Sequence, residues 1–150
     1  MHNIPERFYR VSVKALILNE TCDKFLICQE DNGKWELPGG GLDWGADIKS
    51  ELTREIQEEM GLVTTWIADR PSYFFTFSFE RSNGYGANVI YETTVADLDF
   101  TPSEECVEIA FVNRETVTDD MQLFSVVHQL LKVFDPARHS QGTMVANNKL

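Results

Sequence analysis

The stretch from Leu37 to Leu62 limits the fold more than any other part of this 150-residue chain, because three consecutive glycines lead into one strongly periodic segment. Between Asp47 and Met60 apolar residues recur every four positions, which is typical of a helix with one buried stripe. These residues are Ile48, Leu52, Ile56 and Met60. Asp47 is suited to the N-cap, and Gly61 to the left-handed position that ends a helix. We therefore predict a helix over 47–60 that packs on a core.

The rest of the sequence predicts several strands and one further helix. Apolar and β-branched runs separated by turn-prone residues indicate two hairpins and a later strand. The second helix has an apolar face and follows two aspartates that are candidate caps. The expected hairpins join 10–20 to 24–30 and 72–80 to 87–97 around a loop at 81–86, the strand covers 106–112, and the helix covers 119–134, with Leu123, Val127, Leu130 and Phe134 on its apolar face and Asp119 or Asp120 as cap. This order predicts a mixed sheet with helices packed on it, in the α+β or the α/β class.

Length and charge limit the organisation of the chain and its partners. One domain is expected over residues 1–136, followed by a loose C-terminal tail at 137–150, where no periodicity is found. The formal charge of -11 opposes binding to nucleic-acid backbones or to anionic membranes. We therefore expect no stable nucleic-acid or membrane binding.

The cysteines and the lack of a long apolar segment indicate a cytoplasmic protein. Cys22, Cys28 and Cys106 are odd in number and lack a C-x-x-C spacing, so the sequence predicts neither a disulfide framework nor a zinc site. No apolar run has the length of a signal peptide core or a membrane span.

The predicted helix carries four glutamates on one face, because each residue advances about 100° around the helix axis. They are Glu51, Glu55, Glu58 and Glu59. One interpretation is a solvated acidic face that Lys49 and Arg54 partly neutralise. The other is a site for a hard cation such as Mg²⁺, which prefers oxygen ligands and takes carboxylates together with substrate phosphates. The preceding glycines would allow a backbone carbonyl to approach the same ion.

The segment from Gly40 to Leu62 resembles the Nudix box, whose signature is G-x5-E-x7-R-E-U-x-E-E-x-G-U, with U an aliphatic residue. The matching residues are Gly40, Arg54, Glu55, Ile56, Glu58, Glu59, Gly61 and Leu62, and the preceding WELPGG is also similar to the family's lead-in. A signature of this length favours the cation site over the solvated face. The resemblance implies an α+β fold of the α/β/α sandwich type, in which a mixed β-sheet lies between helices.

The Nudix resemblance also implies an activity, which is the Mg²⁺- or Mn²⁺-dependent hydrolysis of a diphosphate linkage in a nucleoside diphosphate derivative. It assigns Glu55, Glu58 and Glu59 as metal ligands, with the Gly40 carbonyl as a further one. Glu55 is the leading candidate for the general base, and Arg54 is expected to orient a catalytic carboxylate through its guanidinium group. The resemblance also implies that the general base can come from the loop TPSEECVE, where related enzymes often carry an additional acidic residue. As this catalytic residue we choose Glu105 over Glu104 and Glu108; a solvated loop is the alternative.

One position departs from the Nudix signature, because Ala46 stands where the family has the first Glu. This change favours an alternative function, a catalytically weakened module that binds a nucleotide or a metal. Glu51 lies one turn before Glu55 and is a candidate to replace the missing carboxylate. Asp43 and Asp47 are rival candidates.

Three aromatic residues are candidates to bind a base or sugar, because every nucleobase offers a face for stacking. They are Trp44 after the glycine run, Phe75 in the predicted strand 72–80 and Tyr85 in the hairpin loop. For Phe75, packing in the core is the alternative. We expect a small nucleotide or diphosphate substrate of open identity, and a homodimer as the assembly if there is one.

Overall fold

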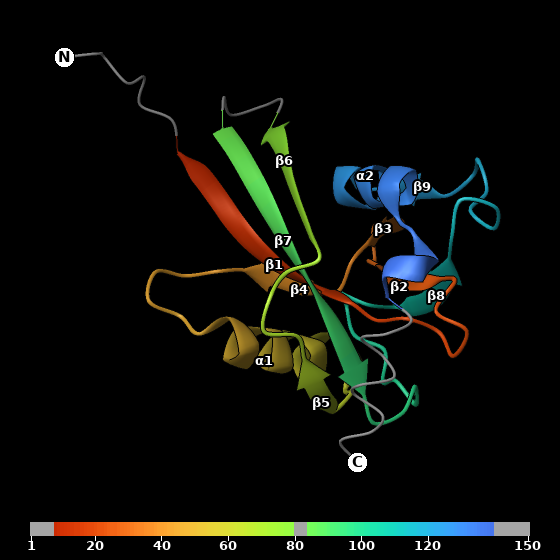
Figure 1. The fold of residues 1–150 in the computed structure, drawn as a ribbon, viewed down its shortest axis with the longest axis horizontal. Helices are drawn as coiled ribbons and strands as arrows, with labels where there is room; N and C mark the ends of the chain where they lie inside the picture. The colour runs from red at the N-terminus through yellow and green to blue at the C-terminus, as the bar shows by residue number, and fades with distance from the viewer. Residues whose placement is uncertain (1–7, 80–83, 140–150) are drawn as a thin grey trace.

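The computed structural model describes residues 8–79 and 84–139, which form two β-sheets and two helices (Figure 1). The first sheet has the order β4-β1-β7-β5, with β6 also paired to β7, and the second has the order β8-β2-β3-β9. Both sheets are mixed, because β1 pairs with β7 and β3 with β9 in parallel, whereas the other pairs are antiparallel. The predicted α+β class, with a mixed sheet between helices, is confirmed. The strands are β1 Tyr9–Leu16, β2 Phe25–Gln29, β3 Lys34–Glu36, β4 Gly39–Gly41, β5 Thr64–Ile67, β6 Tyr73–Phe79, β7 Gly84–Val95, β8 Glu108–Val112 and β9 Gln122–Leu123; the helices are α1 Ile48–Met60 and α2 Ser125–Val133.

Helix α1 has the caps and the buried face that its sequence predicts. The Asp47 side chain accepts a hydrogen bond from the Ser50 backbone N–H at 2.9 Å, and Gly61 has a left-handed φ of 65°. The helix packs through its apolar stripe against β1. The fully buried stripe residues are Leu52, Ile56 and Met60, which join Val13 and Ala15 of β1 in one core cluster. Local sequence therefore fixes both the limits and the orientation of α1.

The first predicted hairpin is wrong in its pairing, although its turn is present. Asn19 closes the turn, because its Oδ1 accepts from the backbone N–H groups of Asp23 and Lys24. Only the isolated bridge Leu18↔Phe25 connects the two arms. Strand β1 is already paired with β7 on one side and with β4 on the other, so β2 pairs instead with β3 and β8 in the second sheet.

The second predicted hairpin and the later strand are confirmed. Strands β6 and β7 pair from Tyr73↔Ile90 to Phe79↔Gly84. Strand β7 begins at Gly84, inside the predicted loop, and the preceding loop residues 81–83 lie outside the described part of the chain. Strand β8 lies within the predicted 106–112 segment.

The predicted start of the second helix is wrong. Helix α2 begins at Ser125 because the preceding Gln122–Leu123 form β9 beside β3, and the Phe124 N–H donates to the Trp35 carbonyl at 2.9 Å. Phe124 is the N-cap and makes no side-chain cap bond. Asp120 instead accepts from the Thr118 hydroxyl.

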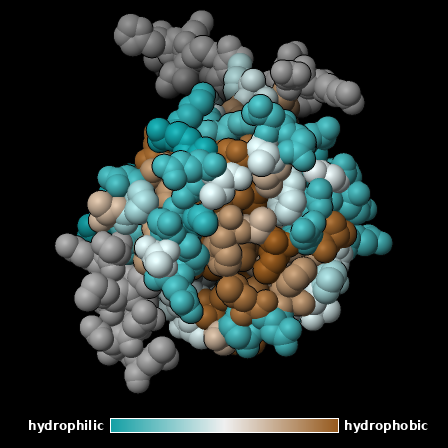
Figure 2. Space-filling view, turned by 90° about the vertical axis from the view of Figure 1, so that its right-hand side faces the viewer, coloured by the Kyte–Doolittle hydropathy of each residue, from teal (hydrophilic) through white to brown (hydrophobic). Residues whose placement is uncertain are grey.

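A second core cluster lies between α2 and the sheets, and it includes Val127, Leu130 and Tyr73. The chain continues past α2 as a 3₁₀ turn over Pro136–Arg138, and the following His139 is buried against the Tyr73 hydroxyl at 2.7 Å. Residues 140–150 of the predicted tail lie outside the described residues. Figure 2 shows that the face to the right in Figure 1 exposes a group of apolar side chains within a polar rim. Neither α1 nor α2 has the length and apolar character needed to cross a bilayer, and this finding covers the described residues alone.

Candidate active site

A polar cavity of about 560 Å³ lies where β4, α1 and the loop before β8 meet. Its lining combines backbone of the glycine strand with acidic side chains. The lining residues that matter below are Lys14, Glu36, Gly39, Gly40, Glu55, Glu59, Glu104 and Glu105. The cavity is therefore strongly acidic and contains a single lysine among its described lining residues.

Three carboxylates converge at this cavity. One oxygen each from Glu55, Glu59 and Glu105 lies within 4.8 Å of the others. Glu55 and Glu59 project from successive turns of α1, as their spacing of four residues predicts. Glu105 comes from the loop before β8, which is held to the end of α1 by two hydrogen bonds: the Ser103 hydroxyl donates to the Glu59 carbonyl at 2.7 Å, and the Thr101 N–H donates to the Met60 carbonyl at 2.7 Å.

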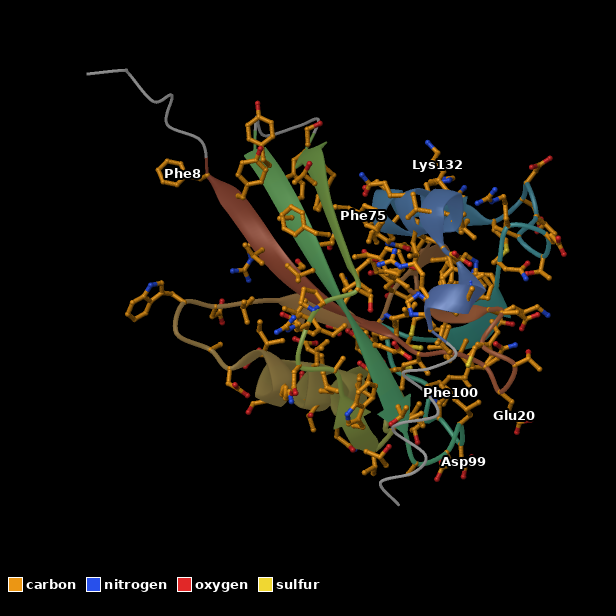
Figure 3. The ribbon with its side chains drawn as sticks, in the orientation of Figure 1. Phe8, Glu20, Phe75, Asp99, Phe100 and Lys132 are labelled. Atoms are coloured by element: carbon orange, nitrogen blue, oxygen red, sulfur yellow. The ribbon has the colours of Figure 1, made fainter. Side chains whose placement is uncertain are left out.

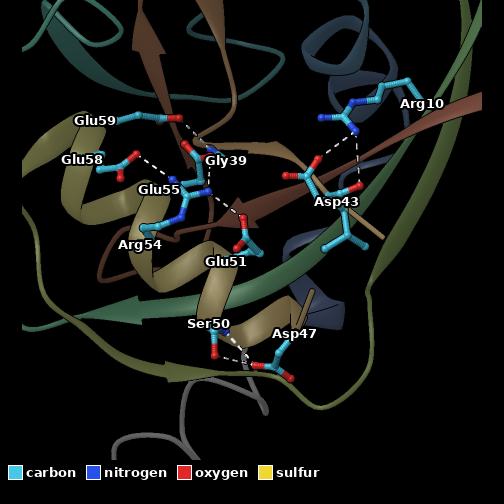
Figure 4. A network of polar contacts seen from close by, with 11 residues as sticks. Arg10, Gly39, Asp43, Asp47, Ser50, Glu51, Arg54, Glu55, Glu58 and Glu59 are labelled. Carbon is cyan, nitrogen blue, oxygen red and sulfur yellow. Dashed lines mark hydrogen bonds and ion pairs between the residues drawn. The ribbon is translucent and has the colours of Figure 1, made fainter. Parts of the chain in front are cut away.

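The glycine strand β4 approaches these carboxylates closely (Figure 4). The Gly39 N–H donates to Glu59 Oε1 at 3.4 Å. At Gly40, a Cβ atom would lie only 2.5 Å from Glu55 Oε1, so a larger residue would displace that carboxylate. The glycines thus allow backbone and carboxylates to share one small space.

Burial makes Glu59 unusual among these groups. Loss of hydration raises the pKa of Glu59 to about 9, which Lys14 opposes and the neighbouring Glu55 reinforces. Metal-free Glu59 therefore holds a proton at neutral pH, and a divalent cation would favour its ionised form. Three converging carboxylates, one of them buried with little compensating charge, fit a hard cation that prefers oxygen ligands.

Arg54 binds three glutamates of α1 at once (Figure 4). Its Nη2 lies 2.6 Å from Glu51 Oε2 and 3.0 Å from Glu55 Oε1, and its Nη1 lies 2.8 Å from Glu58 Oε2. These contacts raise the pKa of Arg54, chiefly through the hydrogen bond to Glu51. The Glu58 side chain is 56% exposed and belongs to this arginine network, whereas Glu55 belongs both to the network and to the three-carboxylate cluster.

The candidates to replace the missing Nudix glutamate lie outside the three-carboxylate cluster. Ala46 lies in a turn in which its N–H donates to the Asp43 carbonyl at 3.1 Å. The Asp43 side chain pairs with Arg10 at 3.3 Å, Asp47 caps α1 and Glu51 binds Arg54. Of the acidic loop residues, Glu104 lines the same cavity as Glu105, and Glu108 begins β8.

The three predicted substrate-binding aromatics do not line this cavity, within the described part of the chain. The Trp44 side chain is fully exposed. Phe75 lies on β6 (Figure 3), where it is partly buried against the second core cluster, between α2 and the sheets. Tyr85 stacks on Tyr9, with ring centroids 5.3 Å apart. Their role in substrate binding stays a prediction.

The structure adds two charged residues that the sequence reasoning missed. Lys14 on β1 faces the cavity and pairs with Glu36 on β3, with Nζ 3.6 Å from Oε2. Burial raises the pKa of Glu36, while Lys14 opposes that rise. The only sequence signal was a lysine inside the otherwise apolar run VKALIL.

Comparison with known proteins places this geometry in a family. The family model described as NUDIX domain matches residues 8–133. The nucleoside triphosphatase NudI of Salmonella paratyphi B is 31% identical over 119 residues, which cover 71% of this chain and 83% of that protein. Nudix hydrolase 25 of Arabidopsis thaliana is 34% identical over 80 residues, 53% of this chain but only 45% of the relative's own length.

Solved structures agree with this assignment. The MutT protein of Methanosarcina mazei has a TM-score of 0.64 and 28% identity, over 89% of this chain and 97% of that one. The ORF135 protein of E. coli has a TM-score of 0.70 at 19% identity, over 91% and 96% of the two chains, and so shares the fold. Because the family model spans most of the sequence, this chain belongs to the Nudix hydrolase family.

Proposed function

We propose that this protein is a divalent-cation-dependent hydrolase that cleaves a diphosphate linkage in a nucleoside diphosphate derivative. The observation that carries the proposal is the convergence of Glu55, Glu59 and Glu105 within 4.8 Å, in a cavity of about 560 Å³. That volume is in the range of small-molecule sites, about 300–1,000 Å³. The relative named nucleoside triphosphatase supports a nucleotide as the substrate.

Glu55, Glu59 and Glu105 would hold Mg²⁺ or Mn²⁺, and the Gly40 carbonyl is a further proposed ligand. Bound there, a divalent cation would neutralise phosphate charge and lower the pKa of a coordinated water. Glu58, which the Nudix box implies as a further ligand, binds Arg54 through Oε2 and lies outside the three-carboxylate cluster. The three-carboxylate cluster is therefore the preferred donor set.

Glu55 is the proposed general base, and Arg54 is its proposed positioning residue. Arg54 engages Glu55 through Oε1 alone and is itself held by Glu51 and Glu58. A guanidinium anchored at three points restricts the rotation of the Glu55 carboxylate. Glu55 Oε2 then stays available to accept a proton from a nearby water, as general-base catalysis requires.

A second candidate function is a Nudix module that binds a nucleotide or a metal but turns over poorly, which Ala46 favours. The test is incubation of the full chain with nucleoside triphosphates and nucleoside diphosphate derivatives, with and without Mg²⁺, followed by product identification. We expect Mg²⁺-dependent release of phosphate, pyrophosphate or a nucleoside monophosphate, and its loss in Glu55→Gln. Tight nucleotide binding without any metal-dependent product would leave the module as the function.

A further inference from the structure

Lys14 is a buried cation in an acidic cavity. It lies on β1 between Val13 and Ala15, which are fully buried, and it pairs across the sheet with Gly39 of the glycine strand. Its side chain is only 9% exposed. Among the described residues that line the cavity, it is the one cation beside seven acidic side chains: Glu30, Asp31, Glu36, Glu55, Glu59, Glu104 and Glu105.

The ammonium group of Lys14 has hydrogen-bonding capacity that the described residues leave unused. Lysine offers three donors. Its ion-pair partner Glu36 is 3.6 Å away, longer than the roughly 2.7–2.9 Å of a charge-assisted N–H···O bond. Glu36 presents a single oxygen, Oε2, to the three donors of Lys14, so it can engage only part of them. Because Lys14 lines the cavity, a ligand bound there can accept hydrogen bonds from the donors that Glu36 does not engage.

Glu36 holds Lys14 in place without satisfying it. The Leu37 N–H donates to Glu36 Oε1 at 2.8 Å, so the carboxylate is fixed by the backbone beside it. Its other oxygen faces Lys14. The lysine is thus oriented by Glu36, and the N–H groups that Glu36 does not engage are available to the cavity that Lys14 lines.

We propose that Lys14 binds a phosphate group of the substrate by donating hydrogen bonds to its non-bridging oxygens. This inference rests on the proposed function, since it assigns a residue to that same cavity. A phosphate fits better than an uncharged group, because lysine acts as a compact point charge for phosphate oxygens. It also explains how an anion is attracted at a surface where every other charged group that lines the cavity would repel it.

The alternative role for Lys14 is only to neutralise the charge of Glu36. Comparing the single variant Lys14→Met with the double variant that also carries Glu36→Gln separates this role from phosphate binding. If neutralisation were its whole role, Lys14→Met would be harmful alone but harmless together with Glu36→Gln, which removes the charge to be neutralised. If Lys14 binds phosphate, the double variant stays as defective as Lys14→Met. Lys14→Arg keeps the charge and should recover part of the binding.

The experiment measures kcat and KM for the best substrate of the full-length protein, with inhibition by inorganic pyrophosphate as a second probe. We expect Lys14→Met to raise KM and to weaken pyrophosphate inhibition at least tenfold, with a smaller change in kcat. Mn²⁺ affinity, measured by titration of the metal alone, should not fall. Thermal unfolding of each variant shows whether it is folded.

Three results would overturn the inference: an unchanged KM in Lys14→Met, full recovery in the double variant, or a loss of Mn²⁺ affinity that parallels the rise in KM. Its failure is distinguishable from that of the proposed function. If the wild-type protein binds nucleotides without hydrolysing them, the hydrolase proposal fails. The role of Lys14 is then tested by nucleotide dissociation constants, which should be at least tenfold higher in Lys14→Met than in the wild type. A wild-type protein that neither binds nor hydrolyses nucleotides overturns both.

Discussion

Replacing Glu59 by glutamine should stabilise the metal-free protein at alkaline pH while it removes a proposed metal ligand. Glu59 is 6% exposed, and burial raises its pKa from 4.5 to about 9. At pH 8 the folded protein therefore holds Glu59 protonated, whereas the unfolded chain ionises it. A protonated carboxyl and a carboxamide have nearly the same shape, so Glu59→Gln changes the packing of the folded state little. The unfolded wild-type chain is stabilised by ionisation of Glu59 at this pH, and the unfolded variant lacks that stabilisation.

The sign and size of the effect follow from linkage. A group whose pKa is raised on folding contributes stability that is fully present below its unfolded pKa and declines as the pH rises toward its folded pKa. Between pH 4.5 and pH 8 that decline has a ceiling of about 5 kcal/mol, at about 1.4 kcal/mol per pKa unit. Because rearrangement and water entry reduce such penalties, we expect Glu59→Gln to gain about 2 kcal/mol at pH 8, or about 4–8 °C in Tm.

Urea unfolding of the two proteins at pH 5 and pH 8, without metal, measures this difference. The advantage of Glu59→Gln should be about 2 kcal/mol at pH 8 and fall to a few tenths of a kcal/mol near pH 5, which is only slightly above the unfolded pKa of 4.5. Glu58→Gln is the matched control, because Glu58 is largely exposed and should change stability by no more than about 0.5 kcal/mol.

Saturating Mg²⁺ should make the wild-type protein more stable than Glu59→Gln at pH 8. A ligand that binds only the folded state adds about 2.7 kcal/mol when its concentration is 100 times its Kd. We expect that gain in the wild type and little of it in Glu59→Gln. An advantage of Glu59→Gln that is equal at pH 5 and pH 8 would refute the reasoning, because it would not arise from proton binding.

Three further predictions test the surroundings of the site. Gly40→Ala should lower metal affinity and turnover at least tenfold, because a Cβ would lie 2.5 Å from Glu55 Oε1 and displace that carboxylate. Mn²⁺ titration and steady-state assays measure the two effects; unchanged values would show that the site does not need the Glu55 carboxylate in its present position. Leu52→Ala should cost about 2–5 kcal/mol in urea unfolding, because Leu52 is fully buried between α1 and the sheet. Asp47→Ala should cost about 1 kcal/mol by loss of the cap bond to Ser50, with Asp47→Asn restoring most of it.

Sequence alone predicted α1 well because everything that defines it is local. The apolar period, the Asp47 cap and the Gly61 terminus lie within 15 residues of one another, and each has a direct physical reading. The proximity of Glu55 and Glu59 follows from helix geometry alone. Their meeting with Glu105 depended on the family resemblance, because no local pattern brings residue 105 to residue 55.

The errors all involve contacts between distant segments. The first hairpin failed because β7 and β4 take both sides of β1, which is decided by strands that come later in the chain. The start of α2 was predicted too early because β3 draws Gln122–Leu123 into the second sheet. Lys14 was overlooked for the same reason, since its place in the cavity comes from pairing with Gly39, 25 residues away.

The two hydrogen bonds that fasten the loop before β8 to the end of α1 have a consequence for the lifetime of the site. The carbonyls of Glu59 and Met60 accept from Ser103 and Thr101, so the last turn of the helix is completed by the same segment that delivers Glu105. The same loop is also fixed by the Asp31 N–H, which donates to the Glu104 carbonyl at 3.1 Å, and by the fully buried Cys106. Fraying of the helix end should therefore weaken cation affinity by loosening one of several anchors of Glu105, and complete loss of affinity on heating should coincide with unfolding of the core that holds Cys106.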